Sequence, residues 1–206
     1  MFRFISCVII IFISSCAHNG NPVLTKARPY KVIKEEQFPC SVEGRTTRHW
    51  VIISDSDSRE EFGQTCMRAA LDLHNEFGTD YTSVLLVPTR KLLGMVYYAQ
   101  ATFVTDSLGT KGLERTGVDP RHRFIWDVSA ASRPLTALEI KIGELWMDLS
   151  PKYRSSNPLS SSLFDGDRIK HAVADSLGLN PDSVKFPKVD YRKTYYVKNK
   201  YMVNDR

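Results

Sequence analysis

The sequence lacks the short motifs by which many catalytic and metal sites are recognised. Its four cysteines and five histidines include no CxxC pair and no Cys/His spacing suited to zinc, so no metal ligand is predicted. GxSxG, HExxH and the phosphate-binding GxxxxGK[ST] motif are absent, so no catalytic residue and no bound cofactor are predicted either. These absences favour a non-enzymatic protein and leave open an enzyme with an unrecognised site.

Long apolar runs are also absent. One apolar run lies near the start of the chain, and it is short. Residues 4–13 are apolar and follow Arg3, but a membrane-spanning helix needs about 20 such residues. The length suits the apolar region of an export signal, and small residues follow as cleavage requires. Residues 1–15 are therefore predicted to be a signal peptide, with no membrane span in the mature chain.

The end of this signal, Ile13-Ser14-Ser15-Cys16, resembles the lipobox of bacterial lipoproteins. That resemblance implies a diacylglyceryl group on the Cys16 thiol, cleavage before Cys16, and a further acyl chain such as palmitate on the new amino terminus. Two or more acyl chains anchor a protein stably. Ala17, in place of Asp, implies the outer membrane, facing the periplasm. The alternatives are an ordinary secretory signal and an uncleaved anchor.

The remaining composition is that of an ordinary globular protein. Of 206 residues, 42% are hydrophobic and 25% are charged, which predicts one domain with a real core. The net charge of +5 suits an anionic lipid or polymer but is too small and spread to indicate nucleic-acid binding. The expected partners are membrane lipid through Cys16 and an unknown protein or envelope polymer.

Two cysteines remain once Cys7 is removed with the signal and Cys16 is lipidated. Cys40 and Cys66 could pair in an oxidising periplasm, which would stabilise the fold by about 3–4 kcal/mol. The alternative is that Cys66 is a small core residue, because it falls on the apolar stripe of a predicted helix.

The order of predicted elements indicates an α+β fold. Residues 16–28 are polar and form a tether, residues 29–150 form the main domain, and residues 151–206 add a helix and a basic, Tyr-rich strand to the same domain. Strands are predicted at residues 30–38, 45–53, 81–87, 95–104 and 123–128, and helices at 58–77, 136–149 and 167–177. Short connections between strands predict a two-layer fold, with a mainly antiparallel sheet and helices packed on one face.

Helix ends carry clear signals. Ser58/Glu61 and Thr136/Glu139 have the spacing of capping boxes, and Gly78 stands at the end of the first helix. The predicted buried stripes are Phe62, Cys66, Ala69, Ala70, Leu73 and Phe77 on the first helix, and Leu138, Ile142, Leu145, Trp146 and Leu149 on the second. The acidic runs 55–58 and 165–167 could ligate a metal, but their places before helices favour caps.

Two segments could suggest nucleic-acid binding. Residues 169–186 have the small and apolar positions of a helix-turn-helix, but Pro181 and Pro187 leave no room for a recognition helix. A helix closed by Gly178 and followed by a turn is favoured. The tail's tyrosines and lysines could stack on a polyanion, but an edge strand protected by lysines is favoured.

Three segments resemble the family DUF4875 of small bacterial and phage proteins: RHWVIISDSDSREEFGQTCMRAALDLHNEFGTDYTSVLLVP, LTALEIKIGELW and LGLNPDSVKFP. The resemblance covers about residues 30–195 and implies a compact α+β domain. The resemblance implies no reaction, ligand or site residue. A lipobox would not be expected in a cytosolic member of such a family.

The predicted function is that of a membrane-anchored envelope lipoprotein that acts by contact with a partner. One alternative is an envelope hydrolase, which would need a pocket with carboxylates or histidines of perturbed pKa. The other is a nucleic-acid-binding protein that uses residues 169–186.

Overall fold

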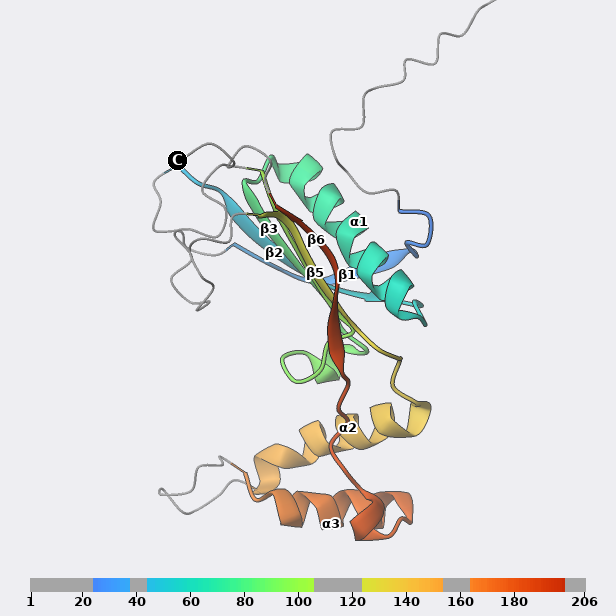
Figure 1. The fold of residues 1–206 in the computed structure, drawn as a ribbon. Helices are drawn as coiled ribbons and strands as arrows, with labels where there is room; N and C mark the ends of the chain where they lie inside the picture. Colours follow the sequence, from blue (N-terminus) through green and yellow to red (C-terminus); the bar gives the residue numbers. More distant parts are fainter. Residues whose placement is uncertain (1–23, 38–43, 106–123, 154–163, 199–206) are drawn as a thin grey trace, which may run out of the picture.

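The computed structural model describes residues 24–37, 44–105, 124–153 and 164–198, and all structural statements concern these residues. Six strands form one sheet in which spatial order follows chain order (Figure 1). They are β1 (Tyr30–Glu36), β2 (Thr47–Ser54), β3 (Tyr81–Leu86), β4 (Ala99–Val104), β5 (Phe124–Ala131) and β6 (Tyr191–Lys198). β2 and β3 are parallel and the other four neighbouring pairs are antiparallel, so the predicted α+β class and mainly antiparallel sheet are confirmed.

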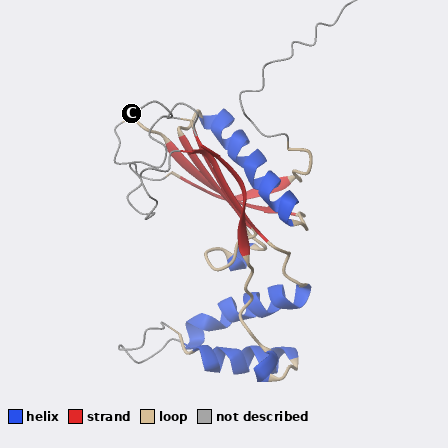
Figure 2. Cartoon of the chain, viewed as in Figure 1, coloured by secondary structure: helices blue, strands red, loops and turns tan. Residues whose placement is uncertain are grey.

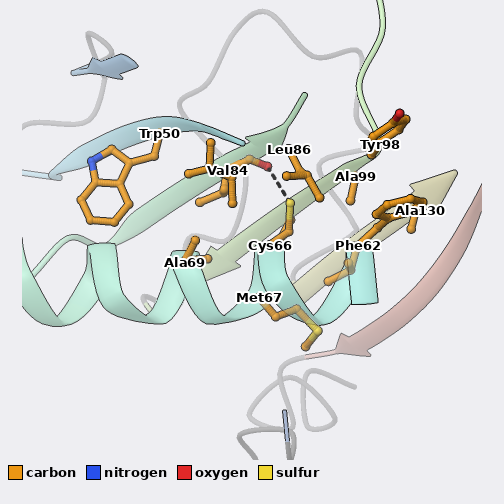
Figure 3. Packing of buried hydrophobic residues seen from close by; sticks show 14 of the residues in the cluster. Trp50, Phe62, Cys66, Met67, Ala69, Val84, Leu86, Tyr98, Ala99 and Ala130 are labelled. Carbon is orange, nitrogen blue, oxygen red and sulfur yellow. Dashed lines mark hydrogen bonds between the residues drawn. The ribbon is translucent and has the colours of Figure 1, made fainter. Parts of the chain in front are cut away.

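One helix covers a face of this sheet. Because β2 and β3 run parallel, the chain must cross over between them, and α1 (Arg59–Phe77) makes that crossover (Figures 1 and 2). The predicted stripe faces the sheet, where Phe62 and Cys66 are fully buried (Figure 3). Leu73 is fully buried as well. Phe62 stacks on Tyr98 with ring centroids 4.6 Å apart. Phe77, predicted as the last buried residue of this stripe, is 36% exposed, so that part of the prediction is wrong.

The ends of α1 follow the sequence signals in part. The Ser58 side chain accepts a hydrogen bond from the Glu61 amide at 3.4 Å, and Gly78 ends the helix with φ 61°. The predicted capping box is wrong in its second half. The Glu61 carboxylate accepts from the Asp57 amide and from Arg28, so it does not return to Ser58.

The two remaining helices form a small lobe at one end of the sheet (Figures 1 and 2). α2 (Ala137–Leu149) starts with the complete Thr136/Glu139 capping box, and α3 (Gly166–Leu177) starts at Asp165. Their shared core consists of Ile142, Ile169, Val173, Ala174 and Val184. Short 3-10 turns are η1 (Arg90–Leu92) before β4, η2 (Ser150–Tyr153) after α2 and η3 (Pro181–Ser183) after α3.

Two further predicted details of packing are wrong. Leu138, assigned to the buried stripe of α2, is 50% exposed, because it lies in the first turn before the helix meets η1 and α3. β4 begins at Ala99 and not at Met95, whose amide closes a turn onto Leu92. After that turn the Tyr98 ring lies against Phe62 of α1.

No described helix is both long and apolar enough to cross a membrane.

Candidate functional site

A cleft of about 360 Å³ lies at the end of the sheet where β2 and β3 finish. Its lining residues are Pro29, Tyr30, Lys31, Ile53, Ser54, Asp55 and Pro88. The local sequence explains the opening, because Pro29 precedes β1 and Pro88 follows β3, and proline cannot extend the hydrogen bonding of a sheet. Parallel strands bring their carboxyl ends to one edge, so the ends of β2 and β3 meet there.

The side of the cleft next to α1 is held by a relay of hydroxyl groups. The Ser54 Oγ donates to the Pro29 carbonyl at 2.7 Å, and hydroxyl contacts of 3.1 and 3.0 Å link Ser54 to Ser56 and Ser56 to Thr65. The Arg28 amide donates to Thr65 Oγ1 at 2.9 Å. An amide only donates and a carbonyl only accepts, so the relay must run from Arg28 through Thr65, Ser56 and Ser54 to Pro29.

The relay begins and ends in residues 24–30, which we call the N-terminal strap. The strap lies along α1 through polar contacts. Lys26 pairs with Glu60 at 2.7 Å, and Arg28 pairs with Glu61 at 2.6 Å. The Tyr30 hydroxyl donates to Asp72 at 2.7 Å, and burial is the main reason why the pKa of this phenol is raised. One wall of the cleft is thus fixed to the helix by the strap.

The Arg28–Glu61 pair also sets the charge beside the cleft. The hydrogen bond from Arg28, followed by that from the Asp57 amide, lowers the pKa of the Glu61 carboxyl. Glu61 therefore stays ionised and holds the strap over the whole neutral range of pH.

The lining residues offer both charged and apolar groups to a ligand. Lys31 supplies an ammonium group and Asp55 a carboxylate, while Pro29, Ile53 and Pro88 supply apolar surface. The Ser54 hydroxyl already donates to a carbonyl oxygen, and no histidine or cysteine is among the described lining residues that could activate it as a nucleophile.

The comparison with known families agrees with the fold. The sequence profile of a "Domain of unknown function (DUF4875)" matches residues 25–189, which is most of the chain. The chain belongs to the DUF4875 family. The resemblance read from the three sequence segments is thereby confirmed.

A solved structure has the same fold as this DUF4875 chain. It is the crystal structure of a DUF487 family protein from Desulfovibrio piger ATCC 29098, with a TM-score of 0.65 and 22% sequence identity. The match covers 82% of this chain and 96% of that chain. At this identity the likeness establishes the fold alone. No curated protein matches the chain.

Of the three cysteines predicted as site residues of this DUF4875 chain, only Cys66 lies among the described residues. Cys16 and Cys40 lie outside the described residues, so lipidation and the Cys40–Cys66 pair stay predictions. Cys66 is fully buried between α1 and the sheet, and its Sγ lies 3.9 Å from the Val84 carbonyl oxygen (Figure 3). Burial raises the pKa of this thiol. The core position proposed for Cys66 is confirmed.

Both acidic runs serve helix starts, as favoured from the sequence. Ser58 caps α1, and the Asp165 carboxylate accepts from the Arg168 amide at 3.1 Å to cap α3. Asp55 does not cap and instead lines the cleft. Among the described residues no group of three or more His, Cys, Asp or Glu side chains is arranged to hold a metal ion.

The segments weighed for nucleic-acid binding have the favoured structures. α3 ends at Leu177, Gly178 adopts φ 64°, and only the three-residue turn η3 follows, so residues 169–186 contain no recognition helix. β6 pairs with β5 alone and is an edge strand, as predicted. Lys193 on this strand pairs with Asp127 at 3.0 Å.

The cleft itself was missed by sequence reasoning. Lys31 and Ser54 belong to no motif, and they come together only because β1 pairs with β2 in a register that places Tyr30 opposite Ser54. The available signal was a proline immediately outside each of two predicted strands.

Proposed function

We propose that the protein is a lipid-anchored binding protein of the bacterial envelope, attached through Cys16 and acting by contact with a partner. The observation that carries the proposal is the sequence Ile13-Ser14-Ser15-Cys16 at the end of a short apolar run. The thiol of Cys16 is the only group there able to accept a diacylglyceryl chain, and the small residues before it suit the signal peptidase.

The position of the strap supports a domain held close to the membrane. Leu24, the first described residue, is eight residues after Cys16, and eight residues reach at most about 28 Å when extended. From Lys26 onward the chain is attached to α1. An anchor at Cys16 would therefore keep the domain, and the cleft beside the strap, near the lipid surface.

The chemistry of the cleft supports binding as the mode of action. The cleft combines the Lys31 ammonium group and the Asp55 carboxylate with apolar lining residues. Its serine hydroxyl already donates a hydrogen bond within the relay. Binding sites commonly pair an apolar lining with a few polar groups that orient the ligand.

Metabolic labelling with an alkyne fatty acid tests the proposal. The wild-type chain and a Cys7→Ala variant should both take up label, because Cys7 leaves with the signal, whereas Cys16→Ala should lose it. Density-gradient separation of inner and outer membranes then tests the predicted outer-membrane location. Label retained in Cys16→Ala, or absent from the wild type, would contradict lipidation at Cys16.

A further inference from the structure

The location of the cleft is one at which sheets of this kind bind ligands. β2 and β3 are the one parallel pair among the described strands, and α1 joins the end of β2 to the start of β3. In sheets with parallel strands, ligands bind in the crevice outside the carboxyl ends of those strands. Ser54 and Asp55 at the end of β2, and Pro88 after β3, occupy that position.

Two opposite charges border this cleft without a partner. Lys31 and Asp55 are both exposed, and within the described part of the chain neither side chain takes part in an ion pair or hydrogen bond. Neighbouring charges do have partners, such as Lys34 with Glu36 at 2.7 Å. The unpaired ammonium and carboxylate therefore offer complementary charges to a ligand that carries both signs.

The apolar lining lies in the same cleft as the two charges. Pro29, Ile53 and Pro88 can contact an uncharged middle portion of a ligand, while Lys31 and Asp55 contact its ends. We propose that this cleft binds a short unblocked peptide, with its carboxylate at Lys31 and its amino group at Asp55. A cleft of about 360 Å³ is at the small end of ligand sites, which suits about two or three small residues.

The cleft is prepared for such a ligand before binding. The hydroxyl relay fixes the Pro29 carbonyl to Ser54, and the strap holds Pro29 and Tyr30 against α1. A wall that is already ordered loses little conformational entropy when a ligand arrives. The Pro29–Ser54 contact is thus both structural and a means of keeping the site open.

A zwitterionic lipid headgroup such as phosphoethanolamine shares the charges but not the shape. Only two methylene groups separate its phosphate ester oxygen from its amine, so it would cover less of Pro29, Ile53 and Pro88 than a tripeptide does. For this reason the structure favours a peptide, and the headgroup becomes a competing outcome of the test.

The inference rests on the proposed binding role but not on the lipid at Cys16. The test is a titration of the purified full chain, in detergent, followed by the amide resonances of its NMR spectrum. Tri-alanine should shift the amides of residues 29–31 and 53–55, while N-acetyl-tri-alanine amide and glycerophosphoethanolamine should not. Fatty-acid labelling remains a separate readout, so failure of one proposal does not decide the other.

Substitutions make the test specific to the two charges. Lys31→Met and Asp55→Asn should each weaken tri-alanine binding about tenfold, because each removes one charge-assisted contact. The matched controls are Lys34→Met on the same strand and Asp57→Asn in the same loop, which should bind as the wild type does. All four positions are exposed, so the fold is retained, and unchanged melting temperatures verify it.

Several results would overturn the proposal. They are no shifts with tri-alanine at millimolar concentrations, equal shifts with the blocked peptide, equal affinity in Lys31→Met and Asp55→Asn, and preferential binding of glycerophosphoethanolamine.

Discussion

The sheet with α1 and the lobe of α2 and α3 are built on cores of very different size. The first core includes the fully buried Phe62, Leu73 and Trp126 and extends over α1 and all the central strands. The second has only five buried residues between two helices. A small core removes little apolar surface from water, so the lobe has less stability of its own than the sheet.

The lobe contacts the sheet domain where α2 packs against η1 and the chain before β6, and we call this contact the joint. Gly143 of α2 lies so close to η1 and the chain before β6 that a Cβ there would be 2.9 Å from Leu92 Cδ2 and 2.9 Å from Pro187 Cγ. Lys91 also pairs with Asp148 at 2.6 Å. We therefore expect the lobe to open before the sheet does, as locally less stable parts of proteins do.

The largest effect is expected in the sheet core. Phe62→Ala should lower the free energy of unfolding by about 3–5 kcal/mol, because it removes a fully buried ring that stacks on Tyr98. Urea denaturation measures the change, and Phe77→Ala, at a position 36% exposed, is the control with a smaller loss. Equal losses for the two variants would refute the central place given to Phe62.

The matching change in the lobe should act locally. Ile169→Ala removes a fully buried side chain and should cost about 2–5 kcal/mol in the lobe. Hydrogen exchange should then accelerate in α3 and stay unchanged in α1. Leu138→Ala, which alters a half-exposed residue, should leave both rates alone. Faster exchange across the whole sheet in Ile169→Ala would show that lobe and sheet unfold together.

The joint is tested by adding a methyl group. Gly143→Ala should destabilise the lobe by about 1–3 kcal/mol, because Leu92 and Pro187 are buried and cannot move away freely. Gly166→Ala at the start of α3 is the control, since nothing lies within 4 Å of its added Cβ. Thermal melts of both variants provide the comparison, and a Gly143→Ala variant as stable as Gly166→Ala would remove the joint from the account.

A smaller effect is expected on the dependence of stability on pH, through His49 in the sheet. Burial lowers the pKa of His49 in β2 from its ordinary 6.5, so the unfolded chain takes up a proton first as the pH falls. The contribution of His49 to stability is therefore full above pH 6.5 and declines below it. His49→Gln should flatten the dependence of stability on pH between 7.5 and 5.5, as urea denaturation at each pH would measure. An unchanged slope in His49→Gln would contradict this assignment.

The smallest effect is expected at the start of α2. Two hydrogen bonds from Arg133 lower the pKa of Glu139 from 4.5 to about 2, so the pair stabilises the helix start above pH 4.5 and is lost as the pH falls toward 2. Arg133→Gln should make exchange in α2 faster at neutral pH and weaken this acid dependence, because Glu139 keeps its hydrogen bonds with Thr136. The pair is solvent-exposed, so the sheet should not respond.

The same difference between regions decided what the sequence could predict. In α1 the stripe from Phe62 to Leu73 meets a broad sheet, so helical spacing identified these stripe positions correctly, although it missed the buried Met67. In α2 the covering surface is made mainly by α3, η1 and the chain before β6, and the pattern could not show that Leu138 falls beyond it. The start of β4 was predicted too early because the alternating pattern does not show the turn that Met95 closes onto Leu92.

The cleft could not be predicted from the sequence, because only the tertiary structure brings its residues together. The ends of β1, β2 and β3 lie up to 59 residues apart in the chain, from Pro29 to Pro88, and register alone brings them together. Helix caps could be predicted because their partners are three residues apart. A pair of charges such as Lys31 and Asp55 carries no such local signal.

Intact mass spectrometry of the mature protein, extracted from membranes of the native host, tests the central claim most directly. We predict a chain that begins at Cys16 and carries a diacylglyceryl group, with a further acyl chain on its amino terminus. A chain that starts at Met1, or one cleaved elsewhere and free of lipid, would contradict it.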